Sequence, residues 1–139
     1  MNDAGLHRRA FLAGACSLAA LGLTAVPAAA DSAIRKLSDG RLAVRIRQVP
    51  NLSQVGGAVR IGSINGVPVG LARTGTARFK AFSLRCPHQG AIVERDAAGW
   101  ICPAHGSEFE PDGDLVLGPA TTGLARIPSR VTKGEVIVG

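Results

Sequence analysis

Short runs of alternating apolar and polar residues, separated by turn signals, fill most of the chain after residue 40. Residues 41–48 (RLAVRIRQ) place an apolar side chain at every second position, which is the period of a half-buried β-strand. Residues 58–64 and 67–72 are similar apolar runs and flank Asn65-Gly66, the strongest short signal for a β-hairpin. The pattern therefore predicts antiparallel strands joined by tight turns.

Further short runs predict the remaining strands. Pro68 lacks a backbone N–H, so we expect its strand to lie at a sheet edge. Lys133-Gly134 is expected to form a turn, and no segment after residue 30 has the period of an amphipathic helix. The additional strands are predicted at residues 78–85, 92–95, 100–101, 108–110, 115–117, 124–128 and 135–138. The fold class expected is all-β, with about nine or ten short strands.

The chain divides into three parts by pattern and size. Residues 1–30 have the features of an exported leader, residues 31–40 are expected to be a linker, and residues 41–139 suffice for one modest domain. The domain's composition, rich in Gly, Val and Ile, agrees with a β-fold. There are no internal repeats.

The N-terminus predicts export by the twin-arginine route. Residues 8–12 (RRAFL) match the twin-arginine pattern, and an apolar stretch rich in small residues follows at 11–30. The run PAAA at 27–30 is a suitable cleavage site before Asp31. Residues 11–30 can also span about 30 Å as a helix, so two readings stay open: a cleaved signal peptide, or a signal helix retained as a membrane anchor.

Two short segments carry the candidate chemistry: CPHQG at 86–90 and CPAHGS at 102–107. Each offers one thiolate and one imidazole, Cys86 with His88 and Cys102 with His105. Four such ligands on paired loops can hold a metal centre. A structural zinc site is one alternative, although zinc modules more often pair Cys with Cys and His with His. A disulfide between the two cysteines is another, but it leaves both histidines unexplained.

The letters around these ligands resemble the two ligand boxes of the Rieske family almost throughout. In that family two Cys bind one iron of a [2Fe–2S] cluster and two His bind the other. The resemblance covers about residues 57–139 and implies that Cys86, Cys102, His88 and His105 hold one [2Fe–2S] cluster. It also implies antiparallel sheets with an inserted cluster-binding subdomain at about residues 86–120.

The resemblance assigns supporting roles as well. The hydroxyl of Ser107 would donate to a bridging sulfide, and Phe109 stands where respiratory members of the family usually have a tyrosine that bonds a ligand thiolate. Ser107 and Phe109 are therefore expected to tune the cluster. The residues expected to shield it are Pro87, Pro103, Gly118, Pro119 and Ala120.

Two departures distinguish this chain from the respiratory branch. That branch usually has an extra cysteine after each ligand box, joined as a disulfide, and here the matching positions are Ala91 and Ala104. The chain also contains no tyrosine. Both features argue against the iron–sulfur subunit of a quinol–cytochrome c reductase, which stays open as an alternative.

Charge is unevenly distributed, although the whole chain carries a net +6. Residues 31–85 hold ten Lys or Arg against two Asp, whereas residues 86–114 hold one Arg against six Asp or Glu. Acidic residues near the cluster can steer a basic redox partner, such as a c-type cytochrome, and the basic part can rest on anionic lipid or a partner subunit. Nucleic acid is not expected, because no stacking aromatics accompany the charge.

The sequence thus predicts a periplasmic one-electron transfer protein, at the outer face of the cytoplasmic membrane if the leader is retained. It would be a free carrier or the small subunit of an oxidoreductase, with a redox partner such as a c-type cytochrome or an oxidoreductase large subunit. We expect an electron-transfer component rather than a catalyst in its own right. A structural zinc-binding module is the alternative from a different class.

Overall fold

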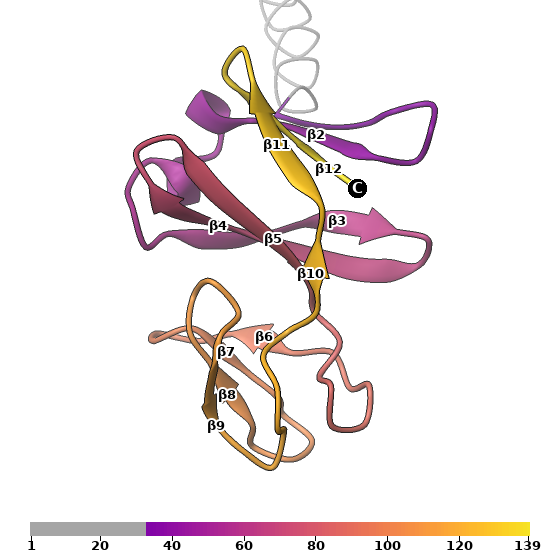
Figure 1. The fold of residues 1–139 in the computed structure, drawn as a ribbon, viewed down its shortest axis with the longest axis vertical. Helices are drawn as coiled ribbons and strands as arrows, with labels where there is room; N and C mark the ends of the chain where they lie inside the picture. Colours follow the sequence, from indigo (N-terminus) through magenta and orange to yellow (C-terminus); the bar gives the residue numbers. More distant parts are fainter. Residues whose placement is uncertain (1–32) are drawn as a thin grey trace, which may run out of the picture. The chain divides into compact units, whose positions relative to one another are not determined.

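The computed structural model describes residues 33–139, which form twelve strands and two short 3-10 helices (Figure 1). The strands make three four-stranded sheets, and every strand pairing is antiparallel. The predicted all-β class is confirmed. No helix among residues 33–139 is long and apolar enough to cross a membrane, and the predicted leader lies outside the described residues.

The first sheet joins the two ends of the described chain. Its strands, in spatial order, are β1 (Ile34–Lys36), β2 (Leu42–Arg45), β12 (Glu135–Val138) and β11 (Ser129–Thr132). The expected linker at 31–40 is wrong for β1, which pairs with β2 in the register Ile34↔Val44. Its sequence, IRK, places two cations after one apolar residue, so no alternating pattern marks the strand. β11, with the sequence SRVT, holds one large apolar residue and was not predicted for the same reason.

The predicted strand at 41–48 ends early. β2 stops at Arg45, and Ile46–Gln48 turns into a 3-10 helix, η1, followed by η2 at Pro50–Leu52. The reason lies in the partner strand, because β12 begins at Glu135, opposite Arg45. The Ile46 N–H instead donates to the carbonyl of Gly134 in the turn (3.3 Å).

The second sheet carries the predicted hairpin. Its order is β10 (Arg126–Ile127), β5 (Arg78–Ser83), β4 (Val67–Gly75) and β3 (Ala58–Ile64). The turn between β3 and β4 has Asn65 and Gly66 at φ +51° and +78°, as the Asn-Gly signal requires.

The edge position expected from Pro68 is wrong, because β4 lies between β3 and β5. A residue's N–H and C=O point the same way across a sheet, and the Pro68 carbonyl accepts from the N–H of Leu84 (2.8 Å). Leu84 follows the last residue of β5. The missing N–H therefore faces the loop beyond β5, and no β4–β5 ladder bond is lost.

The third sheet is inserted between β5 and β10. Its strands, in order, are β6 (Glu94–Arg95), β7 (Trp100–Ile101), β8 (Glu108–Phe109) and β9 (Leu115–Leu117). They lie at the opposite end of the described part from the first sheet, with the second sheet between them (Figure 1). The insert includes residues 86–120, where the sequence predicts the cluster-binding subdomain.

The second sheet is buried on both faces because its side chains alternate between two cores. Leu71 and Ala81 pack into the core shared with the first sheet, whereas their neighbours Ala72 and Phe82 pack into the core shared with the third. The second of these cores also contains Cys86, Cys102, Trp100 and Phe109. The two candidate ligand thiols therefore belong to the core that packs against the second sheet, which is the central one.

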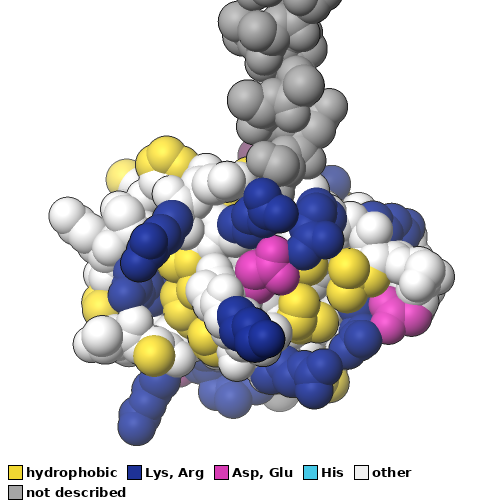
Figure 2. All heavy atoms as spheres, turned by 90° about the horizontal axis from the view of Figure 1, so that it is seen from above, with side chains coloured by type: hydrophobic (Ala, Val, Ile, Leu, Met, Phe, Trp, Pro, Cys, Tyr) yellow, Lys and Arg dark blue, Asp and Glu magenta, His cyan; other side chains and the backbone are white. Residues whose placement is uncertain are grey.

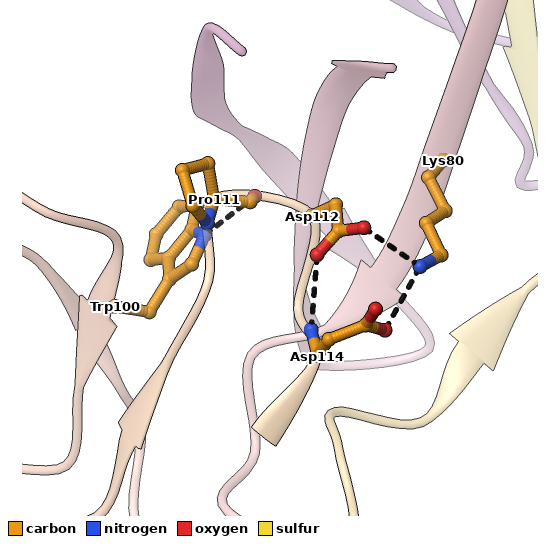
Figure 3. A network of polar contacts seen from close by, with 5 residues as sticks. All are labelled: Lys80, Trp100, Pro111, Asp112 and Asp114. Atoms are coloured by element: carbon orange, nitrogen blue, oxygen red, sulfur yellow. Dashed lines mark hydrogen bonds and ion pairs between the residues drawn. The ribbon is translucent and has the colours of Figure 1, made fainter. Parts of the chain in front are cut away.

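A polar network fixes the insert to the central sheet (Figure 3). Lys80 on β5 donates to the carboxylates of Asp112 (3.0 Å) and Asp114 (2.9 Å) in the loop between β8 and β9. The indole Nε1–H of Trp100 donates to the carbonyl of Pro111 in the same loop (3.0 Å). The loop between β8 and β9 is thus bound both by Trp100 of the insert and by Lys80 of the second sheet.

Burial and charge act in opposite directions on this network. Burial raises the pKa of Asp112, but the hydrogen bond from Lys80 and the backbone N–H of Asp114 outweigh it, so the pKa of Asp112 is lowered. Burial lowers the pKa of Lys80, but hydrogen bonds to Asp114 and Asp112 outweigh it, so the pKa of Lys80 is raised. Both groups stay charged in the neutral range.

We expect Lys80→Met to lower the free energy of unfolding by about 1–3 kcal/mol at pH 7, because it leaves Asp112 partly buried without its cation. The stabilisation from Asp112 is present above its unfolded pKa, about 3.9, and is lost as pH falls through its lower folded pKa. That from Lys80 is lost above about pH 10.4. The difference from wild type, measured by denaturant unfolding, should be largest between about pH 5 and 10.

Arg41→Met is the matched control, because Arg41 pairs with Asp39 on the exposed surface. Exposed pairs contribute roughly 0–1 kcal/mol. Equal losses for the two variants, or a Lys80→Met loss that persists unchanged at pH 3, would contradict the role given to the network.

Candidate metal centre

The first ligand loop is a tight turn closed by backbone hydrogen bonds. It leaves the end of β5 and returns through an isolated bridge between Arg85 and Ile92. Within it the Cys86 N–H donates to the carbonyl of Ala91 (2.7 Å), and the Gly90 N–H donates to the carbonyl of Cys86 (2.8 Å). Gly90 has φ +78°, a conformation that glycine adopts without strain.

The second ligand loop, between β7 and β8, repeats this design. The Cys102 N–H donates to the carbonyl of Ser107 (2.8 Å), and the Gly106 N–H donates to the carbonyl of Cys102 (2.8 Å). Gly106 has φ +81°, and it follows its cysteine by four residues, as Gly90 does. The two loops therefore present their ligands from equivalent backbone frames.

The sequence interpretation did not single out Gly90 and Gly106. The signal was present, because each glycine stands at the same distance from its cysteine although the histidines do not. A Cβ added at either position would meet nothing within 4 Å, so the requirement for glycine comes from φ alone.

The four candidate ligands separate into an inner and an outer pair. Cys86 and Cys102 are 1% and 0% exposed, whereas His88 and His105 are both exposed. The two imidazole rings lie 4.8 Å apart between centroids, at an interplanar angle of 78°. The fold thus brings residues from two separate loops to one site.

The donor set fits a two-iron cluster. Both cysteines are free thiols, so the disulfide alternative is not realised in this structure. In the described part of the chain, no three Cys, His, Asp or Glu side chains are grouped closely enough to hold one metal ion. A cluster in which each iron takes two protein ligands needs no such group. The inner thiols would bind one iron and the outer imidazoles the other, which stays a prediction for these four residues.

A third loop closes over the second ligand loop. Ser107 is fully buried, and its Oγ accepts a hydrogen bond from the N–H of Ala120 (3.0 Å), which is itself buried. The hydroxyl hydrogen of Ser107 remains available as a donor. The sequence analysis expected Ser107 to tune the cluster and Ala120 to shield it, and the fold joins these two residues by a hydrogen bond.

The other residues expected to tune or shield the cluster lie around the same loops. Phe109 is buried beside the second loop, opposite Trp100 on β7. Four residues of the expected shield are exposed: Pro87, Pro103, Gly118 and Pro119. Pro87 and Pro103 lie in the two ligand loops, and Gly118 and Pro119 lie in the third loop. Their shielding roles stay predictions.

Comparison with known proteins identifies the family of this chain. A family profile for the Rieske [2Fe–2S] domain matches residues 43–128. The chain is 32% identical over 89 residues to the cytochrome b6-f complex iron-sulfur subunit of Prochlorococcus marinus, covering 61% of this chain and 50% of that protein. It is 39% identical over 54 residues to the chloroplastic subunit of the same name from Triticum aestivum, covering 37% and 24%.

A solved structure agrees with this assignment. The plasma membrane Rieske protein PetC3 from Synechocystis PCC 6803 superposes with a TM-score of 0.51 at 22% identity, over 73% of this chain and 88% of that one. This likeness shows the fold. The chain spans half or less of the length of the curated relatives it matches. The profile match establishes that this chain belongs to the Rieske family, whose members bind one [2Fe–2S] cluster and transfer electrons.

Proposed function

We propose that this protein is an exported one-electron carrier whose cluster is held by Cys86, Cys102, His88 and His105. The observation that carries the proposal is the arrangement of these four side chains, with buried thiols beneath two adjacent, exposed imidazoles. The cluster, when bound, accepts and releases single electrons. The thiols lie in the core, and the imidazoles lie at the surface where a redox partner can approach.

The leader supports a location outside the cytoplasm. Residues 8–12 carry the twin-arginine pattern, and this route exports proteins that have already folded around a cofactor. The partner would be a c-type cytochrome or the large subunit of an oxidoreductase. Residues 86–114, which include both ligand loops, hold six Asp or Glu against Arg95, and an acidic excess of this kind suits a basic partner.

Replacing both Arg8 and Arg9 by lysine tests the location. We expect the wild-type chain in the periplasmic or membrane fraction and the double variant in the cytoplasm, because the twin-arginine signal is read by a receptor. The cytoplasmic variant should still contain iron. If the double variant is exported like the wild type, the proposed route is wrong.

A second candidate function follows from the curated relatives, which are named as iron-sulfur subunits of the cytochrome b6-f complex. This chain would then serve a membrane complex that oxidises quinol. Ala91 and Ala104, in place of the cysteines expected in that branch, weigh against it. Co-purification with a subunit containing b-type haem would favour this function over the carrier.

Ser107→Ala should lower the midpoint potential by on the order of 100 mV, because a hydrogen bond from a hydroxyl to a charged acceptor contributes about 1.5–3 kcal/mol to the reduced state. The measurement is a redox titration followed by electron paramagnetic resonance. Ser83→Ala is a suitable control, because its hydroxyl accepts from the Arg85 N–H outside the cluster loops. An unchanged potential in Ser107→Ala would show that this hydroxyl makes no bond to the cluster.

A further inference from the structure

We infer that the end of the domain built from the first sheet is a docking surface for an anionic phospholipid membrane. This inference rests on the proposed export, which would place the domain beside the outer face of the cytoplasmic membrane. The surface lies at the opposite end of the described part from residues 86–120 (Figure 1). Contact with lipid there would leave the exposed histidines free to meet a redox partner.

Cations dominate this end of the molecule. The first sheet and its connections carry seven of them against Asp39 and Glu135: Arg35, Lys36, Arg41, Arg45, Arg47, Arg130 and Lys133. Figure 2 looks onto this end and shows Lys and Arg side chains spread across it, with apolar side chains between them and few acidic ones. Such a field attracts an anionic surface at a range of about 8 Å in physiological salt.

Several of these cations have no internal counter-charge. Arg35 and Arg45 share Glu135, and Arg41 pairs with Asp39. Among residues 33–139, no ion pair or side-chain hydrogen bond engages Arg130 or Lys133. Positive side chains left unpaired next to one another repel, and an external anion removes that repulsion.

Two grooves at the two ends of β11 shape the surface. One, of about 510 Å³, is lined by Arg45, Arg47 and Lys133 and also by Glu135. The other, of about 530 Å³, reaches from β11 towards the insert and is lined by four cations and one carboxylate: Arg78, Lys80, Arg126, Arg130 and Asp112. Guanidinium groups bind phosphate oxygens in pairs, and cations outnumber carboxylates in each groove, so each suits the phosphate of a lipid headgroup.

The apolar part of the surface is also suited to a membrane. Val131 on β11 lies next to Arg130, lines the second groove and is 41% exposed. An exposed apolar side chain beside cations is typical of protein surfaces that enter the headgroup region.

The course of the chain favours a membrane over a soluble acidic partner. The described chain enters the domain through β1, which belongs to this same sheet, and β1 itself carries Arg35 and Lys36. The apolar stretch at 11–30 precedes it by only a few residues. Any contact that this stretch makes with the membrane would bring the first sheet near the lipid surface.

Vesicle binding tests the inference. Residues 33–139 contain all three sheets and both cores, so a protein of residues 31–139 loaded with its cluster folds without the leader. It is sedimented with vesicles of phosphatidylcholine alone or of phosphatidylcholine and phosphatidylglycerol in equal parts. We expect binding only to the anionic vesicles and its loss at high salt.

Arg130→Glu and Arg60→Glu form a matched pair. Both arginines are exposed on strands, and neither has an ion-pair partner among the described residues, but Arg130 belongs to the first sheet whereas Arg60 lies on β3 of the second sheet. Each cation near an anionic lipid surface contributes roughly a fivefold change in binding. Arg130→Glu should therefore reduce the vesicle partition coefficient by about 25-fold, and Arg60→Glu should change it by less than about threefold.

No binding to the anionic vesicles would overturn the inference. Equal losses in the two variants would overturn it too, because they would show an effect of net charge without a defined surface. The visible and paramagnetic spectra of the cluster, recorded on the same samples, separate this outcome from failure of the proposed function. A normal cluster with no vesicle binding contradicts the docking surface alone.

Discussion

Cys102→Ser is expected to purify with almost no iron, against about two irons per chain for the wild type. Cys102 is fully buried, and its backbone is fixed by two hydrogen bonds within the second ligand loop, so no neighbouring group can replace the thiolate. A serine hydroxyl is a hard ligand that stays protonated at neutral pH and binds iron–sulfur clusters poorly. Iron and acid-labile sulfide analysis, with the visible spectrum, measure the loss.

Cys16→Ser is the natural control, because Cys16 is the one other cysteine of the chain and lies in the predicted leader. It should keep the full iron content. If Cys102→Ser retains its cluster, or if Cys16→Ser loses iron to the same extent, the ligand assignment is wrong.

Trp100→Ala is expected to lower the free energy of unfolding by about 3–5 kcal/mol, the range for removing a large aromatic from a core. The indole is 2% exposed and meets the Phe82 ring edge to face, with 5.8 Å between centroids. Its Nε1–H donates to the carbonyl of Pro111, and the Arg95 guanidinium lies over the ring, 5.4 Å from its centroid. Guanidinium unfolding of the cluster-loaded protein, followed by circular dichroism, gives the change.

Trp100→Phe separates packing from hydrogen bonding. It keeps much of the contact with Phe82 and loses the bond to the Pro111 carbonyl, so we expect a smaller loss, about 1–2 kcal/mol. A loss below about 1 kcal/mol for Trp100→Ala would mean that the insert is stabilised mainly by its bound cluster. Its apolar core would then contribute little.

The strands that the sequence predicted best are those bounded by strong turn signals. β3 and the start of β4 flank Asn65-Gly66, whose conformation is fixed locally, and β12 follows Lys133-Gly134. β1 and β11 went unrecognised because each holds one large apolar residue, shows no alternation, and forms through its pairing with a neighbour in the first sheet. The prediction from Pro68 was wrong because an edge position depends on pairing at a distance.

The site shows the same division between local and distant information. The ligand types and their spacing are local, and so were predicted together with Ser107 and Ala120, which the fold joins by a hydrogen bond. The bonds from Lys80 to Asp112 and Asp114 were not foreseen, because they join β5 to a loop of the insert that lies 32 and 34 residues further along the chain. The side chains of β4 and β5 alternate between two cores, and one of these cores contains both thiols. This arrangement depends on how the sheets stack, which no single segment reveals.

The most direct test of the account is electron paramagnetic resonance on the dithionite-reduced protein, together with its iron and zinc content. We predict about two irons per chain, no zinc, and a rhombic signal with an average g below 2, as mixed histidine and cysteine ligation requires. A protein with one zinc per chain and no signal after reduction would contradict it, and would make the four side chains a structural zinc site.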